Sequence, residues 1–160
     1  MHKDLISEKG FLNYIKEFKD LAEVQKPYWV NEKRVAAELG DRSENAEYIA
    51  SKEMLRNIDK RLRYLDKIIN NSQVVVTKKL SHQKVNFSSQ VTVLDLDTQE
   101  KKTFIILGTH ESNPTLNIIS NKSPLGKVLL GKSIGEEFEF SINTNTFEYE
   151  ILSIKSSQDY

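Results

Sequence analysis

The stretch "LGDRSENAEY", residues 39–48, separates two segments whose apolar residues recur every three or four positions. Gly40 favours a helix end in the left-handed conformation, and residues 41–44 have the spacing of a capping box, with Asp41 or Ser43 as the N-cap. The stretch therefore predicts that one helix ends here and a second begins. It also carries three carboxylates, which are either ordinary charges of a helix terminus or groups held out for chemistry: Asp41, Glu44 and Glu47.

The segments on either side of this stretch fit each other as the arms of a helical hairpin. The first apolar stripe comprises Phe11, Tyr14, Phe18, Leu21, Gln25, Tyr28, Glu32, Val35 and Leu39. The second comprises Tyr48, Ser51, Leu55, Ile58, Leu62, Leu65 and Ile69. Both stripes alternate steps of three and four, which is the seam of a coiled coil. Pro27 is expected to bend the first arm, and Trp29, the only tryptophan, lies beside the predicted seam.

The pairing of the two stripes places the turn. In an antiparallel hairpin the residue numbers of facing residues add up to a constant, and every layer from Leu39–Tyr48 to Phe18–Ile69 gives 86 or 87. The turn is therefore centred between residues 43 and 44. Each arm has about 30 residues and should extend about 45 Å.

After about residue 74 the pattern becomes that of short β-strands. Strands are predicted at 90–97, 102–108, 115–120, 137–142 and 147–155. The segment "SPLGKVLLGK" predicts one short helix, with Ser123 as N-cap and Pro124 at its first position. The sequence thus predicts an α+β protein. An antiparallel helical hairpin over residues 1–76 precedes a small antiparallel β domain with one helix over residues 77–160.

Composition excludes several classes of function. The 160 residues hold 23 basic and 23 acidic side chains, so any contact with nucleic acid must come from local charge asymmetry. The absence of cysteine excludes disulfides, thiolate zinc sites and cysteine nucleophiles. The three histidines lack metal-ligand spacing, and no hydrolase or phosphate-loop motif is present. The first ten residues do not form a signal peptide, and no apolar run is long enough for a membrane span, so we expect a soluble, cytoplasmic protein.

A basic strip follows the second arm at spacings of four, four, three and four, within a sector about 80° wide. It consists of Lys52, Arg56, Lys60, Arg63 and Lys67. Two interpretations are open: a solvated helix face, or a strip that follows a phosphate backbone.

Three segments resemble the bacterial transcript cleavage factors of the GreA/GreB family: "LGDRSENAEY", "RNIDKRLRYLDKII" and "SPLGKVLLGKSIGEE". The second segment is closer to GreB. The resemblance implies that an FKBP-like C-terminal domain binds RNA polymerase at the rim of its secondary channel, while the hairpin enters the channel. There Asp41 and Glu44 would help to hold a Mg²⁺ ion shared with the polymerase, which then cleaves its own backtracked transcript.

The resemblance also assigns supporting roles. Arg42, Ser43 and Asn45 would support the tip, and the basic strip would contact the 3′ segment of the nascent RNA. The polymerase would be contacted by the segment Lys122, Ser123, Pro124 and Leu125. Lys122 stands where the family often has Asp or Asn, which reverses the charge at that position. We expect a monomer that binds no metal alone and is not itself an enzyme.

Three other functions compete with this interpretation. A related channel-binding regulator would modulate or inhibit the polymerase without cleavage, but such relatives alter the tip, and "GDRSEN" is intact here. An FKBP-like isomerase or chaperone would line its pocket with aromatic residues, including a tryptophan that the C-terminal half lacks. A dimerisation hairpin would need a second apolar stripe, and the predicted arms leave little of one.

Overall fold

The computed structural model describes residues 3–41 and 45–160, which form two compact units. The hairpin unit is Phe11–Asn71, and the sheet unit comprises Met1–Gly10 together with Ser72–Tyr160. This division differs from the expected boundary at residue 76. The difference arises because β1 (Asp4–Ser7) pairs in parallel with β2 (Ser72–Val75), which places both chain segments in the sheet unit.

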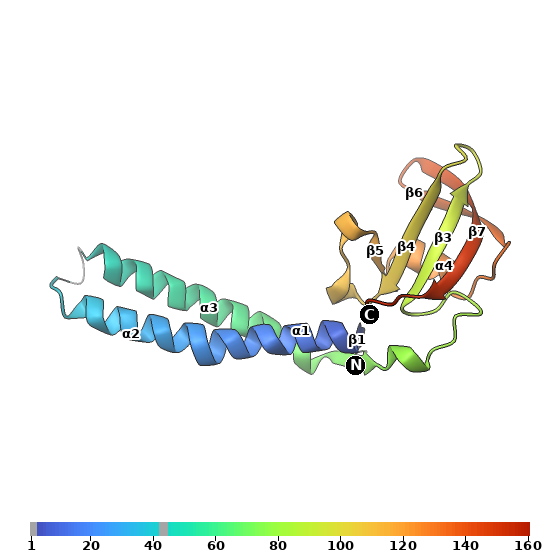
Figure 1. Cartoon of the computed structure of the whole chain (residues 1–160). Coiled ribbons are helices and arrows are strands. Elements are labelled where there is room, and N and C mark those ends of the chain that lie inside the picture. The colour runs from blue at the N-terminus through green and yellow to red at the C-terminus, as the bar shows by residue number, and fades with distance from the viewer. Residues whose placement is uncertain (1–2, 42–44) are drawn as a thin grey trace. The chain divides into compact units, whose positions relative to one another are not determined.

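The hairpin unit contains two antiparallel arms, as predicted (Figure 1). The first arm runs through α1 (Glu8–Lys19), the π-helix η1 (Asp20–Gln25) and α2 (Lys26–Ala37), and the second is α3 (Ala46–Asn70). The core of this unit lies between the arms. It is formed by buried Leu21, Ile58 and Leu65, with Tyr14, Phe18, Trp29 and Leu62 packed against them.

The π-helix interrupts the first arm immediately before Pro27. The Lys26 N–H donates to the carbonyl oxygen of Leu21, five residues back, where an α-helix would use the residue four back. Pro27 has no N–H, and its ring would clash with the carbonyl of Glu23 in a regular α-helix. The wider turn therefore lies where the proline disturbs the regular hydrogen-bond pattern, and it adds one residue to the arm.

The extra residue moves the seam of the first arm by one position. Up to Leu21 the predicted seam positions are buried or half-buried, but beyond η1 the prediction is wrong. The predicted residues Tyr28, Val35 and Leu39 are 56%, 39% and 69% exposed. Their successors Trp29 and Ala36 face α3 instead, and Ala36 is only 3% exposed. Trp29 thus lies in the seam, where the sequence pattern placed it beside the seam.

The shifted seam predicts that the same substitution has different effects on stability at two neighbouring residues, Val35 and Ala36. Ala36→Glu should destabilise the protein by about 2–4 kcal/mol, because a carboxylate would be forced into the buried seam. Val35→Glu should change the stability by about 1 kcal/mol or less, because this side chain already reaches solvent. Chemical denaturation followed by Trp29 fluorescence measures both. A larger cost for Val35→Glu would restore the seam predicted from the sequence.

The sheet unit holds a five-stranded sheet in the order β5-β4-β3-β7-β6. Its strands are β3 (Ser89–Asp95), β4 (Lys101–Leu107), β5 (Ile118–Ser120), β6 (Glu137–Ile142) and β7 (Asn145–Ser156). The α+β class is confirmed. The expectation of a wholly antiparallel sheet is wrong at one edge, because β5 pairs with β4 in parallel. The structure also adds β1 and β2, which the sequence pattern did not predict.

Short turns and one helix complete the sheet unit. The helix α4 (Pro124–Leu129) packs Leu129 into a core that contains Val91, Val93, Ile106 and Ile151. Single 3₁₀ turns occupy Thr77–Lys79 (η2), Thr109–Glu111 (η3) and Pro114–Leu116 (η4). The expected strand at 115–120 is shorter than predicted, because Asn117 adopts a left-handed conformation with φ of 54° after η4. Within residues 3–41 and 45–160, no helix is long and apolar enough to cross a membrane.

Candidate functional site

The start of the second arm is capped by Asn45. Its Oδ1 accepts from the Tyr48 N–H at 3.1 Å, and its Nδ2 donates to the carbonyl oxygen of Ala36 at 2.6 Å, which ties the two arms together. The expectation that Asp41 or Ser43 caps this helix is wrong, because α3 begins only at Ala46. Capping therefore does not require the Asp41 carboxylate, and Asp41 is exposed. The other predicted tip residues, Arg42, Ser43 and Glu44, lie outside the described residues.

The described part of the tip forms an open depression of about 420 Å³. It is lined by Leu39, Gly40, Asp41, Asn45, Ala46 and Glu47. No group of three or more His, Cys, Asp or Glu side chains within the described ranges is placed to hold a metal ion. An exposed carboxylate such as Asp41 nevertheless has the donor chemistry that Mg²⁺ prefers. It can supply one ligand to an ion whose other ligands come from elsewhere.

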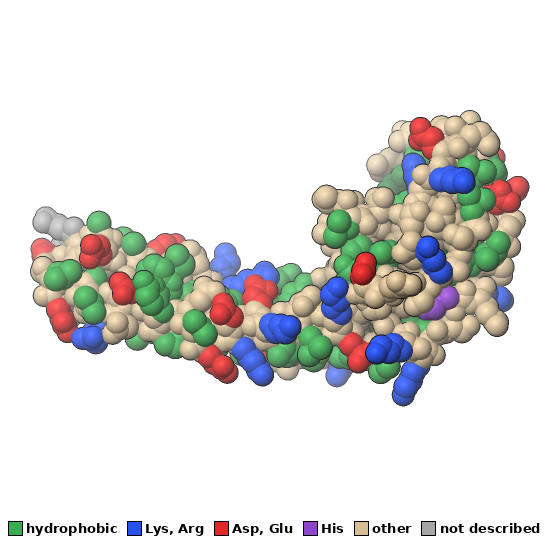
Figure 2. Space-filling model, viewed as in Figure 1, with side chains coloured by type: hydrophobic (Ala, Val, Ile, Leu, Met, Phe, Trp, Pro, Cys, Tyr) green, Lys and Arg blue, Asp and Glu red, His purple; other side chains and the backbone are tan. Residues whose placement is uncertain are grey.

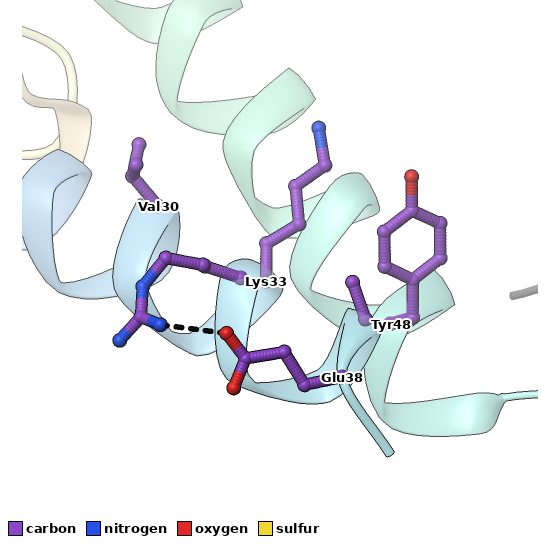
Figure 3. A pocket seen from close by; sticks show the side chains of 6 residues that line it. Val30, Lys33, Glu38 and Tyr48 are labelled. Carbon is purple, nitrogen blue, oxygen red and sulfur yellow. Dashed lines mark hydrogen bonds and ion pairs between the residues drawn. The ribbon is translucent and has the colours of Figure 1, made fainter. Parts of the chain in front are cut away.

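A second depression, of about 430 Å³, lies behind the tip between the two arms (Figure 3). An ion pair of 2.9 Å between Arg34 Nη1 and Glu38 Oε1 borders it on α2. The Lys33 ammonium lies 5.9 Å from the ring centroid of Tyr48, so a cation from the first arm sits over an aromatic ring of the second. Lys33 is thereby held next to α3.

A basic groove continues along the hairpin, with a volume of about 630 Å³. Its basic lining residues are Lys26 and Lys33 from α2 and Lys52, Arg56 and Arg63 from α3. The predicted basic strip is therefore divided: three of its members line the groove, while Lys60 and Lys67 do not. Lys26 and Lys33 were not among the basic residues predicted from the sequence. Their spacing of seven residues, two helical turns, would have placed them on one face of the first arm.

The charge of the groove is only partly balanced. Lys26 Nζ pairs with Asp59 Oδ1 at 2.7 Å, and Arg56 Nη1 lies 3.8 Å from Glu53 Oε2, at the outer limit of an ion pair. Among the described residues, neither Lys52 nor Arg63 has an ion-pair partner. Acidic and basic side chains both occur along the hairpin face seen in Figure 2. The groove is lined by five basic side chains and two acidic ones, Glu53 and Asp59. Such a groove suits a phosphate backbone.

The predicted polymerase-contact segment surrounds the start of α4. Ser123 Oγ accepts from the Gly126 N–H at 3.1 Å and donates to the Ser120 carbonyl oxygen at 2.6 Å, so it is the predicted N-cap. Leu125 packs against the core, whereas Lys122 and Pro124 are exposed. Of these four residues, only Lys122 and Pro124 are therefore exposed to a partner.

Lys122 is part of a small charged cluster in the sheet unit. Its Nζ lies 2.5 Å from Asp4 Oδ1, and His110 Nε2 lies 3.1 Å from Asp4 Oδ2. The hydrogen bond from Lys122 lowers the pKa of Asp4; partial burial opposes this shift, and the hydrogen bond from His110 adds to it. The charge of Lys122 is thus partly balanced by a carboxylate from β1. This partner could not be predicted from the sequence, because more than 100 residues separate Asp4 from Lys122.

This cluster predicts a pH-dependent contribution to stability. Because the folded-state pKa of Asp4 is lowered, its stabilisation is complete above the ordinary pKa near 3.8 and is lost as the pH falls through the lower folded value. Asp4→Asn should therefore cost about 1 kcal/mol at neutral pH, since both partners are partly exposed. Urea denaturation at neutral and strongly acidic pH measures the difference. A cost that stays equal at both pH values would contradict it.

A second histidine, His82, pairs with a serine, and this pair is unsuited to catalysis. His82 Nδ1 lies 2.6 Å from Ser89 Oγ, and burial lowers the pKa of His82. Ser89 is fully buried, and its Oγ already accepts from the Asn86 N–H at 2.9 Å. No substrate can reach this hydroxyl, so the pair belongs to the packing of the sheet unit.

Family models and sequence relatives agree on one family. A model of the N-terminal region of transcription elongation factors matches residues 5–74, and one of the GreA/GreB C-terminal region matches residues 80–156. "Transcription elongation factor GreA" of Nautilia profundicola is 39% identical over 96% of this chain and 95% of its own length. The protein of the same name from Helicobacter pylori strain Shi470 is also 39% identical, over 96% and 94%. Among solved structures, Gfh1 of Thermus thermophilus aligns over 97% of this chain and 100% of its own, with 19% identity and a TM-score of 0.44.

Proposed function

The chain belongs to the GreA/GreB family of transcription elongation factors, and on this basis we propose that it binds bacterial RNA polymerase and stimulates cleavage of backtracked transcripts. In this proposal the hairpin enters the secondary channel of the polymerase and brings its tip to the active centre. In this proposal the polymerase, not the factor, carries out the cleavage. Its two named relatives both carry the GreA name, whereas the sequence of the second arm leans toward GreB.

The exposed carboxylate of Asp41 is the observation that supports this function most. It lies between α2 and α3, where the hairpin turns, and the capping of α3 is provided by Asn45. An exposed carboxylate at the turn of the hairpin has the donor chemistry that Mg²⁺ prefers. The basic groove on the same arms gives the hairpin a surface for phosphates next to its acidic tip.

In this proposal some residues of the chain bind the metal ion and others position the tip and the RNA. Asp41 and Glu44 would hold a Mg²⁺ ion shared with the polymerase, which when bound stabilises the attacking and leaving oxygens of phosphodiester hydrolysis. Two carboxylates are too few ligands to bind Mg²⁺ tightly alone, so the bond is broken only within the polymerase. Asn45 fixes the start of α3, and Arg42 and Ser43, which lie outside the described residues, would support the tip. Lys33, Lys52 and Arg56 would hold the backtracked 3′ segment of the RNA by its phosphates.

The sheet unit would provide the main contact with the rim of the channel. Lys122 and Pro124 are its exposed candidates, and Ser123 and Leu125 shape the segment through capping and packing. With Asp4 beside Lys122, the contact surface holds both signs of charge rather than a single cation. We propose that the factor acts as a monomer in the cytoplasm, where transcription takes place in bacteria.

Transcript cleavage by a stalled polymerase tests this function. Backtracked elongation complexes carrying RNA labelled at its 5′ end are incubated in Mg²⁺ with and without the factor. We expect the factor to shorten the RNA and to restore extension from the new 3′ end. Slower extension without cleavage would favour the alternative, a channel-binding regulator that inhibits the polymerase. An effect on neither reaction would exclude both.

A further inference from the structure

The first helical turn of the chain is capped by a carboxylate from a distant segment. Ser7 Oγ accepts from the Gly10 N–H at 3.0 Å, which is the bond that an N-cap serine makes. In a capping box the residue in the position of Gly10 is Glu or Gln, whose side chain reaches back to the N-cap N–H. Gly10 has no side chain, and Glu111 Oε2 accepts from the Ser7 N–H instead, at 3.1 Å.

The Glu111 carboxylate also caps the 3₁₀ turn η3, to which Glu111 itself belongs. Glu111 Oε2 accepts from the Gly108 N–H at 3.0 Å, which caps η3, and its Oε1 accepts from the Ser7 hydroxyl. One side chain therefore serves the starts of two helical segments that are far apart in the sequence. Ser7 is fully buried, so its N–H and hydroxyl would lose their partner without Glu111. We call this set of residues the anchor: Ser7, Gly10, Gly108 and Glu111.

Two glycines make room for the anchor. A Cβ atom on Gly10 would lie 2.2 Å from Glu111 Oε1, and one on Gly108 would lie 1.7 Å from the carbonyl oxygen of Leu5. Glycine within a helix costs about 1 kcal/mol relative to alanine. Gly10 therefore lowers the intrinsic stability of α1 at its start. The Glu111 carboxylate fills the space that a side chain on Gly10 would occupy.

We propose that Glu111 is a positioning residue, which completes the capping box of α1 from across the chain and holds the first turn of this helix within the sheet unit. This inference rests on the proposed function, in which the sheet unit contacts the polymerase and the hairpin delivers the tip. Because α1 continues from this turn into the hairpin, a frayed first turn would loosen the start of the arm that carries the tip. A misplacement of about 1 Å can cost about 100-fold in rate.

A comparison of maximal rate and affinity tests this role. Glu111→Gln cannot accept at both oxygens, and Gly10→Ala pushes the carboxylate away. Both should lower the maximal cleavage rate at saturating factor by about tenfold or more, while the factor concentration for half-maximal cleavage changes by less than about twofold. Glu148→Gln removes an exposed carboxylate from β7 and should change neither. Wild-type maximal rates in both variants, or a loss that more factor overcomes, would overturn the proposal.

The double variant and amide exchange separate this proposal from the proposed function. Because Gly10→Ala and Glu111→Gln break the same contact, the double variant should lose no more than either single one, and additive losses would count against the anchor. The amides of Ser7 and Gly108 should exchange about tenfold faster in each variant, with β3 and β7 unchanged. Unchanged exchange at Ser7 and Gly108 would refute the anchor even if the wild-type protein stimulated no cleavage.

Discussion

Asp41→Asn and Glu44→Gln should each reduce the maximal rate of factor-stimulated transcript cleavage by about 10- to 100-fold or more. Substitution of groups that only support metal ligands already costs this much, and here the ligands themselves are changed. An amide keeps the size and one oxygen of the carboxylate but loses the negative charge that favours a divalent cation. Both variants should still compete with the wild-type factor for the polymerase, because the proposed main contacts lie in the sheet unit.

Glu47→Gln is the matched control for the tip acids. Glu47 lines the same depression, but it lies in the first turn of α3, where a carboxylate stabilises the helix terminus. Its loss should cost less than about 1 kcal/mol of stability and leave the cleavage rate within about twofold. Undiminished cleavage in both Asp41→Asn and Glu44→Gln would exclude the tip mechanism. An equal loss in Glu47→Gln would show that general acidity of the tip, rather than two particular carboxylates, is what matters.

Charge reversal in the basic groove should give the second large effect. Lys33→Glu and Arg56→Glu together replace two cations on opposite arms with anions. If the groove holds RNA phosphates, the double variant should need about tenfold or more factor for half-maximal cleavage at moderate salt. The slope of log affinity against log salt should become shallower by about two. Titration of factor at several salt concentrations measures both quantities.

Lys60→Glu combined with Lys67→Glu makes the same change of charge on α3 outside the groove. Both residues belong to the basic strip predicted from the sequence, but neither lines the groove. We expect less than about a threefold change from this pair, because neither side chain lines the groove and salt screens exposed charges that do not contact the RNA. If the two pairs lose affinity equally, the contact follows the strip on α3 and not the groove between the arms.

The hairpin was predictable because its signal repeats. Seven layers with a constant sum of residue numbers fix an antiparallel pairing and a turn, whatever happens in any one layer. The register beyond Leu21 was not predictable from the apolar pattern, because Tyr28, Val35 and Leu39 continue its spacing, with Gln25 and Glu32 as polar exceptions. The π-turn beside Pro27 adds one residue and rotates that pattern away from α3. A prediction that treated Pro27 only as a bend missed this insertion.

The functional residues could be predicted where the signal lies within one helix, and they could not where it depends on a distant segment. The basic strip was visible because its members lie on one helix at steps of three and four. The groove was not, because Lys26 and Lys33 reach it from the other arm. The partners of Lys122 and Ser7 lie more than 100 residues away, on segments whose pairing has no periodic signature. The strands β1 and β2 were missed for a related reason, since four residues are too few to establish a period.

The dependence of transcript cleavage on Mg²⁺ concentration tests the role of the tip most directly. Cleavage by backtracked polymerase is measured across a Mg²⁺ titration without factor, with saturating wild-type factor and with saturating Asp41→Asn. If the tip acids help to hold the catalytic ion, the wild-type factor lowers the Mg²⁺ concentration that gives half-maximal cleavage, and Asp41→Asn returns it toward the factor-free value. The same half-maximal concentration with and without the wild-type factor would contradict a role for Asp41 and Glu44 in holding the ion.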